Sequence, residues 1–385
     1  MHGKAIKLKN HGAKVEKRIY AIQIATYTAL MLSITYTPAL AAQAEASPME
    51  IALTFSLYNL AYFLSSMIFG RLADIHGRKV FISAGMLIAS AAFLMQYFYW
   101  DYYSLLTLRI MAGFSAGIFP AATISLAHDI KMKMGKLSAF GAAGWALGSY
   151  FAGIISLFFG LKATYVFSSI VFIFGYLITW KLQDSGVRVK HVPRIPLEVI
   201  KRNWHLYLSY IFRHSAATII WAFWPLFVAS IGGNSFWQAA TMGINSTAQF
   251  FIMYFYADMR KSTHLILWGL ILSSLTFFLY AIITNVWEML PVQVILAASW
   301  AFLYVGSLNY LTAKNPEKAT ATGLLNSSIG ISAFLGPILG GVFMSFIPDY
   351  RYLMVFSGVV ALMGVIVFKI GERGQSTNFI ASPSI

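Results

Sequence analysis

The chain has 385 residues, of which 58% are hydrophobic and only 11% are charged. A soluble domain carries about 25% charged residues, so this composition excludes a water-facing globule. The absence of cysteine excludes a disulfide framework and a thiolate metal site, and we expect no metal and no cofactor.

The apolar residues occur in long uncharged runs bounded by charge, Pro or Gly. About 20 apolar residues cross a ~30 Å hydrocarbon core as a helix, the form in which a single segment satisfies its own backbone in lipid. In chain order, the predicted spans are Ile19–Ala41, Ile51–Phe69, Val80–Trp100, Tyr103–Ala127, Leu137–Phe159, Tyr165–Trp180, Leu206–Ile231, Phe236–Tyr256, Leu265–Asn285, Met289–Leu311, Ala319–Phe346 and Tyr352–Ile370. The first run is too long for a signal-peptide core.

Basic residues give these spans an orientation. An even number of spans places both termini on one side, and that side carries 24 of the 28 Lys and Arg residues. Only Lys162 and Arg351 fall on the opposite side, while Arg109 and Arg213 lie inside spans. The asymmetry predicts cytoplasmic termini. It also accounts for the net charge of +15 without a nucleic-acid partner, although the loops can contact anionic lipid headgroups.

A polar linker at 181–205 divides the spans six and six. We therefore expect an all-α membrane protein with six-helix bundles at 19–180 and 206–370 and cytoplasmic tails at 1–18 and 371–385. Within the linker, Ile195–Arg202 is either a short interfacial helix or an ordinary basic loop.

A weak internal repeat relates the two halves at an offset of 184 residues. It aligns Asp74 with Asp258 and Arg109 with Gln293. Duplicated halves are common in transporters, where the substrate site lies at the junction between them.

The most specific motif is GRLADIHGRK at 70–79, between the second and third spans. It resembles the signature loop of the major facilitator superfamily, whose glycines permit a tight turn. The resemblance implies a twelve-helix carrier in which Gly70, Asp74, Gly77 and Arg78 belong to a cytoplasmic latch between the halves. Asp74 would face a helix N-terminus across the interface, and Arg78 would pair with Asp129. The alternative is a solvated basic turn.

Two further segments resemble this family. Arg109, Gly113 and Gly117 match an R-x-x-x-G-x-x-x-G segment, in which small residues let helices approach and the arginine is often implicated in proton coupling. The helix-bending motif of drug–proton antiporters is incomplete around Gly148, where serine replaces the proline. An intact version, with Gly336, Pro337 and Gly340, occurs in the eleventh span. This departure weakens the case for antiport.

The predicted spans contain buried bases but no central acid. Arg109 and Arg213 either snorkel to the nearer interface or bind an anionic group of the substrate. His214 either couples transport to protons or is a structural, hydrogen-bonded histidine. Other substrate-binding candidates are aromatic or amide residues, namely Gln23, Tyr27, Tyr36, Asn59, Trp145, Trp221, Trp224, Asn245, Gln249, Gln293, Trp300 and Tyr304.

The leading functional prediction is a secondary carrier in the plasma membrane that works by alternating access. The motif pattern resembles drug-exporter-type relatives, which favours efflux of an amphipathic organic solute, with protons as a candidate coupling ion. The first alternative is uptake or exchange of an organic anion, and the second is a non-transporting sensor. No nucleotide-binding P-loop or enzyme site is evident. We expect a monomer whose partners are its substrate, protons and membrane lipids.

Overall fold

The computed structural model describes residues 2–184, 186, 197–256, 262–315 and 318–380, and within these ranges the chain forms helices and no strand. This confirms the predicted all-α class. The helices of the first half, so named here, are α1 (His2–Ile34), α2 (Thr37–Gln43), α3 (Pro48–His76), α4 (Arg78–Met95), the 3-10 turn η1 (Gln96–Phe98), α5 (Tyr102–Gly117), α6 (Pro120–Asp129), α7 (Met134–Phe159) and α8 (Ala163–Thr179). Those of the second half are α9 (Leu197–Ser230), α10 (Ser235–Tyr256), α11 (Ser262–Ile282), α12 (Val286–Lys314), α13 (Lys318–Phe346) and α14 (Tyr350–Ile380).

Ten helical stretches of the described chain are long and apolar enough to cross a membrane. Two further predicted spans correspond to α8 and α10. Helix α8 is apolar but has 17 residues, and α10 has 22 residues but is not among the ten apolar stretches. Both helices nevertheless pack along the transmembrane stretches, α8 against α1 and α4, and α10 against α7 and α12.

Two of the apolar stretches are broken helices. The first bends between α1 and α2 just before Pro38, and the fourth bends between α5 and α6 just before Pro120. Proline lacks a backbone donor and clashes with the preceding helical turn, so a new helix has the proline in its first two positions instead of the old one continuing.

Several helices continue beyond the predicted spans. The motif at 70–79 is helical except for Gly77, whose φ of 112° separates α3 from α4. The predicted tails are also helical where described, since α1 begins at His2 and α14 runs to Ile380. Helical hydrogen bonds are local, so a helix can leave the bilayer without a partner.

The described part of the linker is irregular at 182–184 and helical from Leu197. Residues Leu197–Arg202 form the first turns of α9, which kinks at Asn203 (φ −120°, ψ 16°) before the membrane-spanning part. Asn203 donates a hydrogen bond to Asn315 Oδ1 (2.9 Å) and anchors the kink to α12. Ile195, and Asp258 of the predicted repeat, lie outside the described residues.

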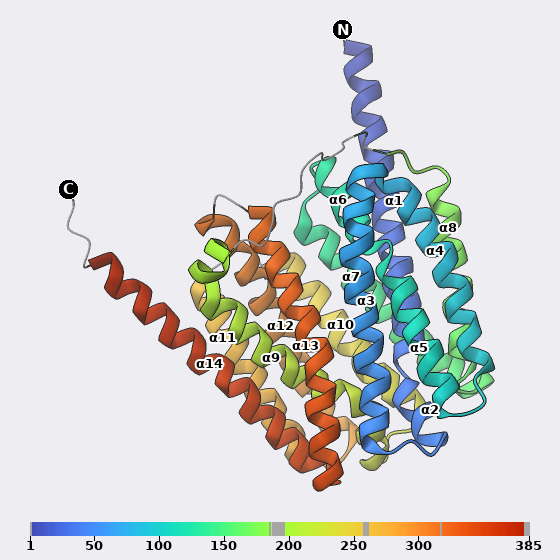
Figure 1. Cartoon of the computed structure of the whole chain (residues 1–385), viewed down its shortest axis with the longest axis vertical. Coiled ribbons are helices and arrows are strands. Elements are labelled where there is room, and N and C mark those ends of the chain that lie inside the picture. Colours follow the sequence, from blue (N-terminus) through green and yellow to red (C-terminus); the bar gives the residue numbers. More distant parts are fainter. Residues whose placement is uncertain (1, 185, 187–196, 257–261, 316–317, 381–385) are drawn as a thin grey trace.

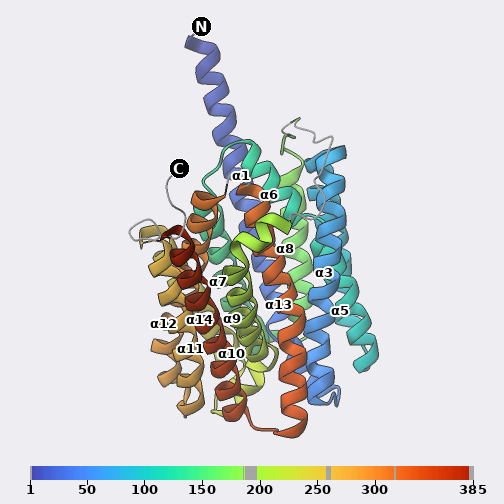
Figure 2. The same cartoon turned by 60° about the vertical axis from the view of Figure 1, so that its left-hand side comes forward.

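The two halves lie side by side, with both chain termini at one end of the bundle, called here the terminal end (Figures 1 and 2). Toward this end each half has its own buried core. The first-half core includes Ile19, Ala73 and Leu126, and the second-half core includes Leu206 and Phe368. Each of these clusters contains buried residues of one half only.

At the opposite end, called the far end, one core joins the halves. Phe55 of the first half and Ile219, Phe223 and Met344 of the second half belong to a single buried cluster. Across the same junction, the Tyr36 hydroxyl donates to the Ser235 carbonyl oxygen. The far end is therefore sealed, whereas the terminal-end cores are separate.

Glycines permit close approach where the predicted packing motifs lie. A Cβ atom on Gly113 would stand 2.2 Å from the Tyr58 carbonyl oxygen, and one on Gly336 would stand 2.4 Å from the Ser215 carbonyl oxygen. Other contacts of these motifs involve Gly117 against α3, Gly148 against α1, and Gly340 against α9, with Pro337 buried inside α13. The motif glycines thus bring α5 onto α3, α7 onto α1 and α13 onto α9.

Candidate functional site

An ion-pair cluster lies at the terminal end of the first half. The turn at Gly77 places Arg78 at the start of α4, where its guanidinium pairs with Asp129 at the end of α6. A second nitrogen lies 3.3 Å from Asp74 Oδ1 on α3. The pairing of Arg78 with Asp129 is the one predicted from the sequence. Arg78 is only 3% exposed, so this charge is stabilised by two carboxylates rather than by water.

The cluster braces three helices of one half. Asp74, Arg78 and Asp129 come from α3, α4 and α6, and Gly70 brings α3 close to Ala121 of α6. The described ion-pair partner of Asp74 is Arg78, and not a helix end of the other half. The described ion pairs of the motif therefore join three helices of the first half.

Arg109 is completely buried in the first half. Its Nη1 donates 3.0 Å hydrogen bonds to Ser33 Oγ and to Gln96 Oε1, and its guanidinium lies 4.1 Å from the centre of the Tyr58 ring. The Nε and Nη2 atoms have no hydrogen-bond partner among the described residues. The side chain therefore stays in the core and does not snorkel to an interface.

Arg213 is the corresponding buried base of the second half. Its Nε donates to Ser273 Oγ (2.8 Å) and its Nη2 to Ser299 Oγ (3.4 Å), while Nη1 has no partner within the described chain. The guanidinium lies 4.9 Å from the centre of the Trp300 ring. Both hydroxyls donate onward to other groups, so the serines act as acceptors for the buried charge.

Next to Arg213, four rings form a surface that we call the aromatic wall: His214 and Trp221 of α9, and Trp300 and Tyr304 of α12. The His214 ring lies 5.5 Å from Trp221 and 5.4 Å from Trp300, and Trp300 stacks on Tyr304 at 5.5 Å. His214 is 5% exposed and its Nδ1 has no partner among the described residues. The other three rings are half-buried.

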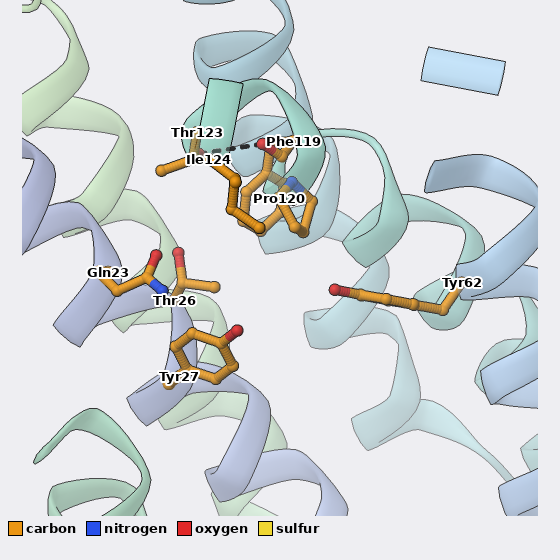
Figure 3. A pocket seen from close by; sticks show the side chains of 8 residues that line it. All are labelled: Gln23, Thr26, Tyr27, Tyr62, Phe119, Pro120, Thr123 and Ile124. Carbon is orange, nitrogen blue, oxygen red and sulfur yellow. Dashed lines mark hydrogen bonds between the residues drawn. The ribbon is translucent and has the colours of Figure 1, made fainter. Parts of the chain in front are cut away.

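A small cavity lies between α1, α3 and α6 of the first half. Tyr27 and Tyr62 extend into it from α1 and α3, and Pro120 lines it where α5 gives way to α6 (Figure 3). Gln23 also lines this cavity. Tyr27 connects the cavity to Trp145, whose ring centre lies 5.9 Å away.

Other predicted substrate-binding residues lie elsewhere. Tyr36 is fully buried in the far-end seal, where its hydroxyl also contacts Ser156 (3.0 Å). Trp224 donates to Thr241 inside the second-half core, and Asn59 donates to a carbonyl of its own helix. These three side chains are engaged in packing.

A set of amide-bearing residues in the second half links α10 to α12. Gln249 donates to Asn245 Oδ1 (2.6 Å), and Asn245 donates to the Gln293 carbonyl oxygen (2.9 Å). The Gln293 side chain is fully buried, and both its amide atoms lack a partner in the described chain.

Sequence reasoning missed Tyr58, Tyr62, Ser33 and Gln96. The two tyrosines lie one turn apart, and their backbone carbonyl oxygens lie close to Gly113 and Gly117 of α5. Only the glycine spacing was visible in the sequence, because the partner helix of a small-residue stripe is decided by tertiary packing.

Two helical halves, a buried arginine within each half and proline-broken spans are the features of a helical membrane transporter. A model of the Major Facilitator Superfamily matches residues 19–258 and 206–384, and the chain belongs to this superfamily. It is therefore a multi-pass protein of the plasma membrane and a transporter rather than an enzyme.

Relatives of known sequence support this assignment. The chain is 25% identical over 379 residues to the uncharacterized MFS-type transporter MJ1560 of Methanocaldococcus jannaschii, covering 91% of this chain and 98% of the relative. It is 22% identical over 350 residues to the quinolone resistance protein NorA of Staphylococcus aureus, covering 85% and 88%. A third relative, the proton-coupled antiporter flippase LtaA of the same organism, is 21% identical over 330 residues, covering 81% and 83%.

Solved structures share the fold. The nucleoside transporter NupG superposes with a TM-score of 0.73 at 11% identity, covering 93% of this chain and 99% of its own. A bacterial homologue of the human lysosomal transporter Spinster, inward-facing and unoccupied, gives 0.74, at 15% identity and with 94% and 97% coverage. At these identities the similarity defines the architecture and not the substrate.

Proposed function

We propose that this chain is a secondary carrier that exports an amphipathic organic solute by alternating access, coupled to proton entry. In this proposal α8 and α10 join the ten apolar stretches to give twelve spans. Two six-helix bundles, at 19–180 and 206–370, rock about a central site and are joined by the linker at 181–205. Both termini are cytoplasmic, and the carrier works as a monomer.

The observation that carries the proposal is the difference between the two ends of the bundle. Buried residues of both halves share one core at the far end, whereas each half keeps its own core toward the terminal end. With cytoplasmic termini, this arrangement corresponds to a state that loads from the cytoplasm. Export would then require the far-end seal to open and the terminal end to close.

Each candidate residue has a place in this cycle. The aromatic wall, Tyr27, Trp145 and Gln23 would contact the solute. His214 would bind and release the coupling proton, Arg109 would take part in coupling as a fixed charge, and the Arg78 cluster would hold the first half rigid as it moves. Support for efflux and proton coupling comes from relatives named for quinolone resistance and proton-coupled antiport.

Flux in proteoliposomes tests the proposal. An amphipathic fluorescent solute should enter vesicles that have an acidic lumen, and a protonophore should abolish its accumulation. Asp74→Asn should slow uptake severalfold, because it weakens the Arg78 cluster, whereas Arg71→Gln should not, because Arg71 is exposed on the same helix.

The alternatives give different results. Exchange of organic anions without a response to the proton gradient would support an anion exchanger that uses Arg213. The absence of flux for every solute, with binding retained, would support a non-transporting sensor and would contradict the proposal.

A further inference from the structure

The positively charged guanidinium of Arg213 lies against the aromatic wall. We propose that this surface selects planar aromatic solutes that are anionic or neutral and discriminates against aromatic cations. The inference rests on the proposed function only in taking the wall as the solute-binding surface of the carrier.

The wall faces the other half of the molecule. The hydroxyl of Tyr304 interacts with Ser138 of α7, which belongs to the first half. Trp300 lies one helical turn before Tyr304 on the same face of α12, and the two rings stack at an interplanar angle of 15°. Trp300 is therefore at the junction between the halves, where a carrier binds its solute.

The charge behind the wall is held in place. Arg213 lies 4.9 Å from the Trp300 ring centre, and Ser273 and Ser299 accept hydrogen bonds from its Nε and Nη2. The side chain is 1% exposed, so water does not screen it. An arginine remains protonated in proteins, so this charge is permanent.

No carboxylate of the described chain neutralises this charge. The acidic residues that the structure describes all lie near one of the two ends of the bundle: Glu16, Asp74, Asp129, Asp184, Glu198 and Glu372 at the terminal end, and Glu45, Glu50, Asp101, Glu288 and Asp349 at the far end. In the first half, Arg109 is a second buried charge of the same sign, and its guanidinium lies over the ring of Tyr58.

This geometry reverses the usual preference of an aromatic surface. An indole ring attracts cations through its quadrupole, but Trp300 already has a guanidinium over it. A solute charge on the accessible part of the ring would lie roughly 8 Å from the guanidinium, where unit charges still interact appreciably at an effective dielectric constant of about 20. The ring can stack on any planar solute, while the charge selects its sign.

Three probes of equal ring size isolate the effect of charge: 2-naphthalenesulfonate, neutral 2-acetylnaphthalene and 2-naphthyltrimethylammonium. Their binding is measured by calorimetry on the full chain in phosphatidylcholine nanodiscs, after subtraction of empty nanodiscs. We expect the sulfonate to bind at least about tenfold more tightly than the ammonium probe, with the neutral probe between them. An equal or higher affinity for the ammonium probe, or no binding of any probe, would overturn the inference.

Variants separate charge from stacking. Arg213→Gln should bring the affinities for the sulfonate and the ammonium probe to within about threefold of each other. Arg213→Lys should still bind the sulfonate more tightly than the ammonium probe. Arg351→Gln, an exposed base at the far end, should leave the sulfonate preference unchanged. Trp300→Leu should weaken all three probes together while preserving their order, which gives a result even where Arg213→Gln does not fold. An unchanged preference in folded Arg213→Gln would contradict the inference.

Because these readouts are equilibrium binding, they do not depend on transport. Sulfonate preference without flux would uphold the inference and count against the carrier proposal. Flux of aromatic cations together with tight binding of the ammonium probe would overturn the inference and support the carrier proposal.

Discussion

Among the described residues, three arginines are shielded from solvent, and their surroundings differ. Arg78 has two carboxylates beside it, whereas Arg109 and Arg213 have hydroxyl, amide and aromatic partners. Burying a charge beside neutral groups is costly, because dipoles replace only part of the lost hydration. Such sites are expected where the charge has a function, and a pair such as that of Arg78 is expected where it joins helices.

Replacing Arg78 by Gln should destabilise the protein by about 1–3 kcal/mol, since it leaves Asp74 and Asp129 without their buried cation. The loss would appear as a lower apparent melting temperature of purified protein in detergent. Arg71→Gln serves as the control, because Arg71 lies on the same helix and is exposed. Equal melting temperatures for the two variants would mean that the cluster contributes no stability.

At the scale of the helix, contact distances decide which glycines matter. Gly336 and Gly323 both belong to α13. A Cβ at 336 would meet a backbone carbonyl at 2.4 Å, whereas a Cβ at 323 would meet nothing within 4 Å. The residue type is identical, so only the neighbouring helix distinguishes the two positions.

The two substitutions to Ala should therefore have opposite signs. Gly336→Ala should cost about 1–3 kcal/mol because α9 and α13 must separate. Gly323→Ala should gain about 0.5–1 kcal/mol because alanine favours the helix. Thermal unfolding in one detergent measures both, and equal shifts would show that the α9–α13 contact is not tight.

The kink of α9 depends on a pair of amides. Asn203 is fully buried and bonds the Val199 carbonyl (3.0 Å) as well as Asn315. Asn203→Ala should cost about 1–3 kcal/mol, because the Asn315 amide loses a partner in a buried site. Asn309→Ala on the half-exposed face of α12 should be nearly neutral. Thermal unfolding measures the stability of both variants. A similar loss of stability in each would exclude a specific role for the kink.

For the whole molecule, the asymmetry of the two ends is the main result. One shared core closes the far end, so the two halves cannot separate there without exposing buried rings such as Phe55 and Phe223. The cores toward the terminal end are independent, and opening there disrupts neither of them. In the proposed alternating-access cycle, the barrier to the opposite state would therefore lie largely in the far-end seal.

Single cysteines can test this state, since the natural chain has none. Ile124 lines the cavity and is 41% exposed, so Ile124→Cys should react with a membrane-impermeant maleimide from the cytoplasmic side. Lys136→Cys should react from the same side and Arg351→Cys from the opposite side, because both positions are exposed at their ends of the bundle. If the maleimide labels Ile124→Cys only from the side from which it labels Arg351→Cys, cytoplasmic access to the cavity is contradicted.

Local sequence patterns were sufficient to predict the helical class, and the resemblance carried by the motif at 70–79 implied the family and the pairing of Arg78 with Asp129. Long apolar runs force helices in lipid, and the motif at 70–79 places an acid and a base at short range. Only the packed structure revealed that Arg109 and Arg213 stay buried beside rings, that Tyr36 belongs to a seal, and that the motif is helical up to Gly77. These features depend on which helix packs against which, and that choice is made by contacts between residues far apart in the chain, which local periodicity does not encode.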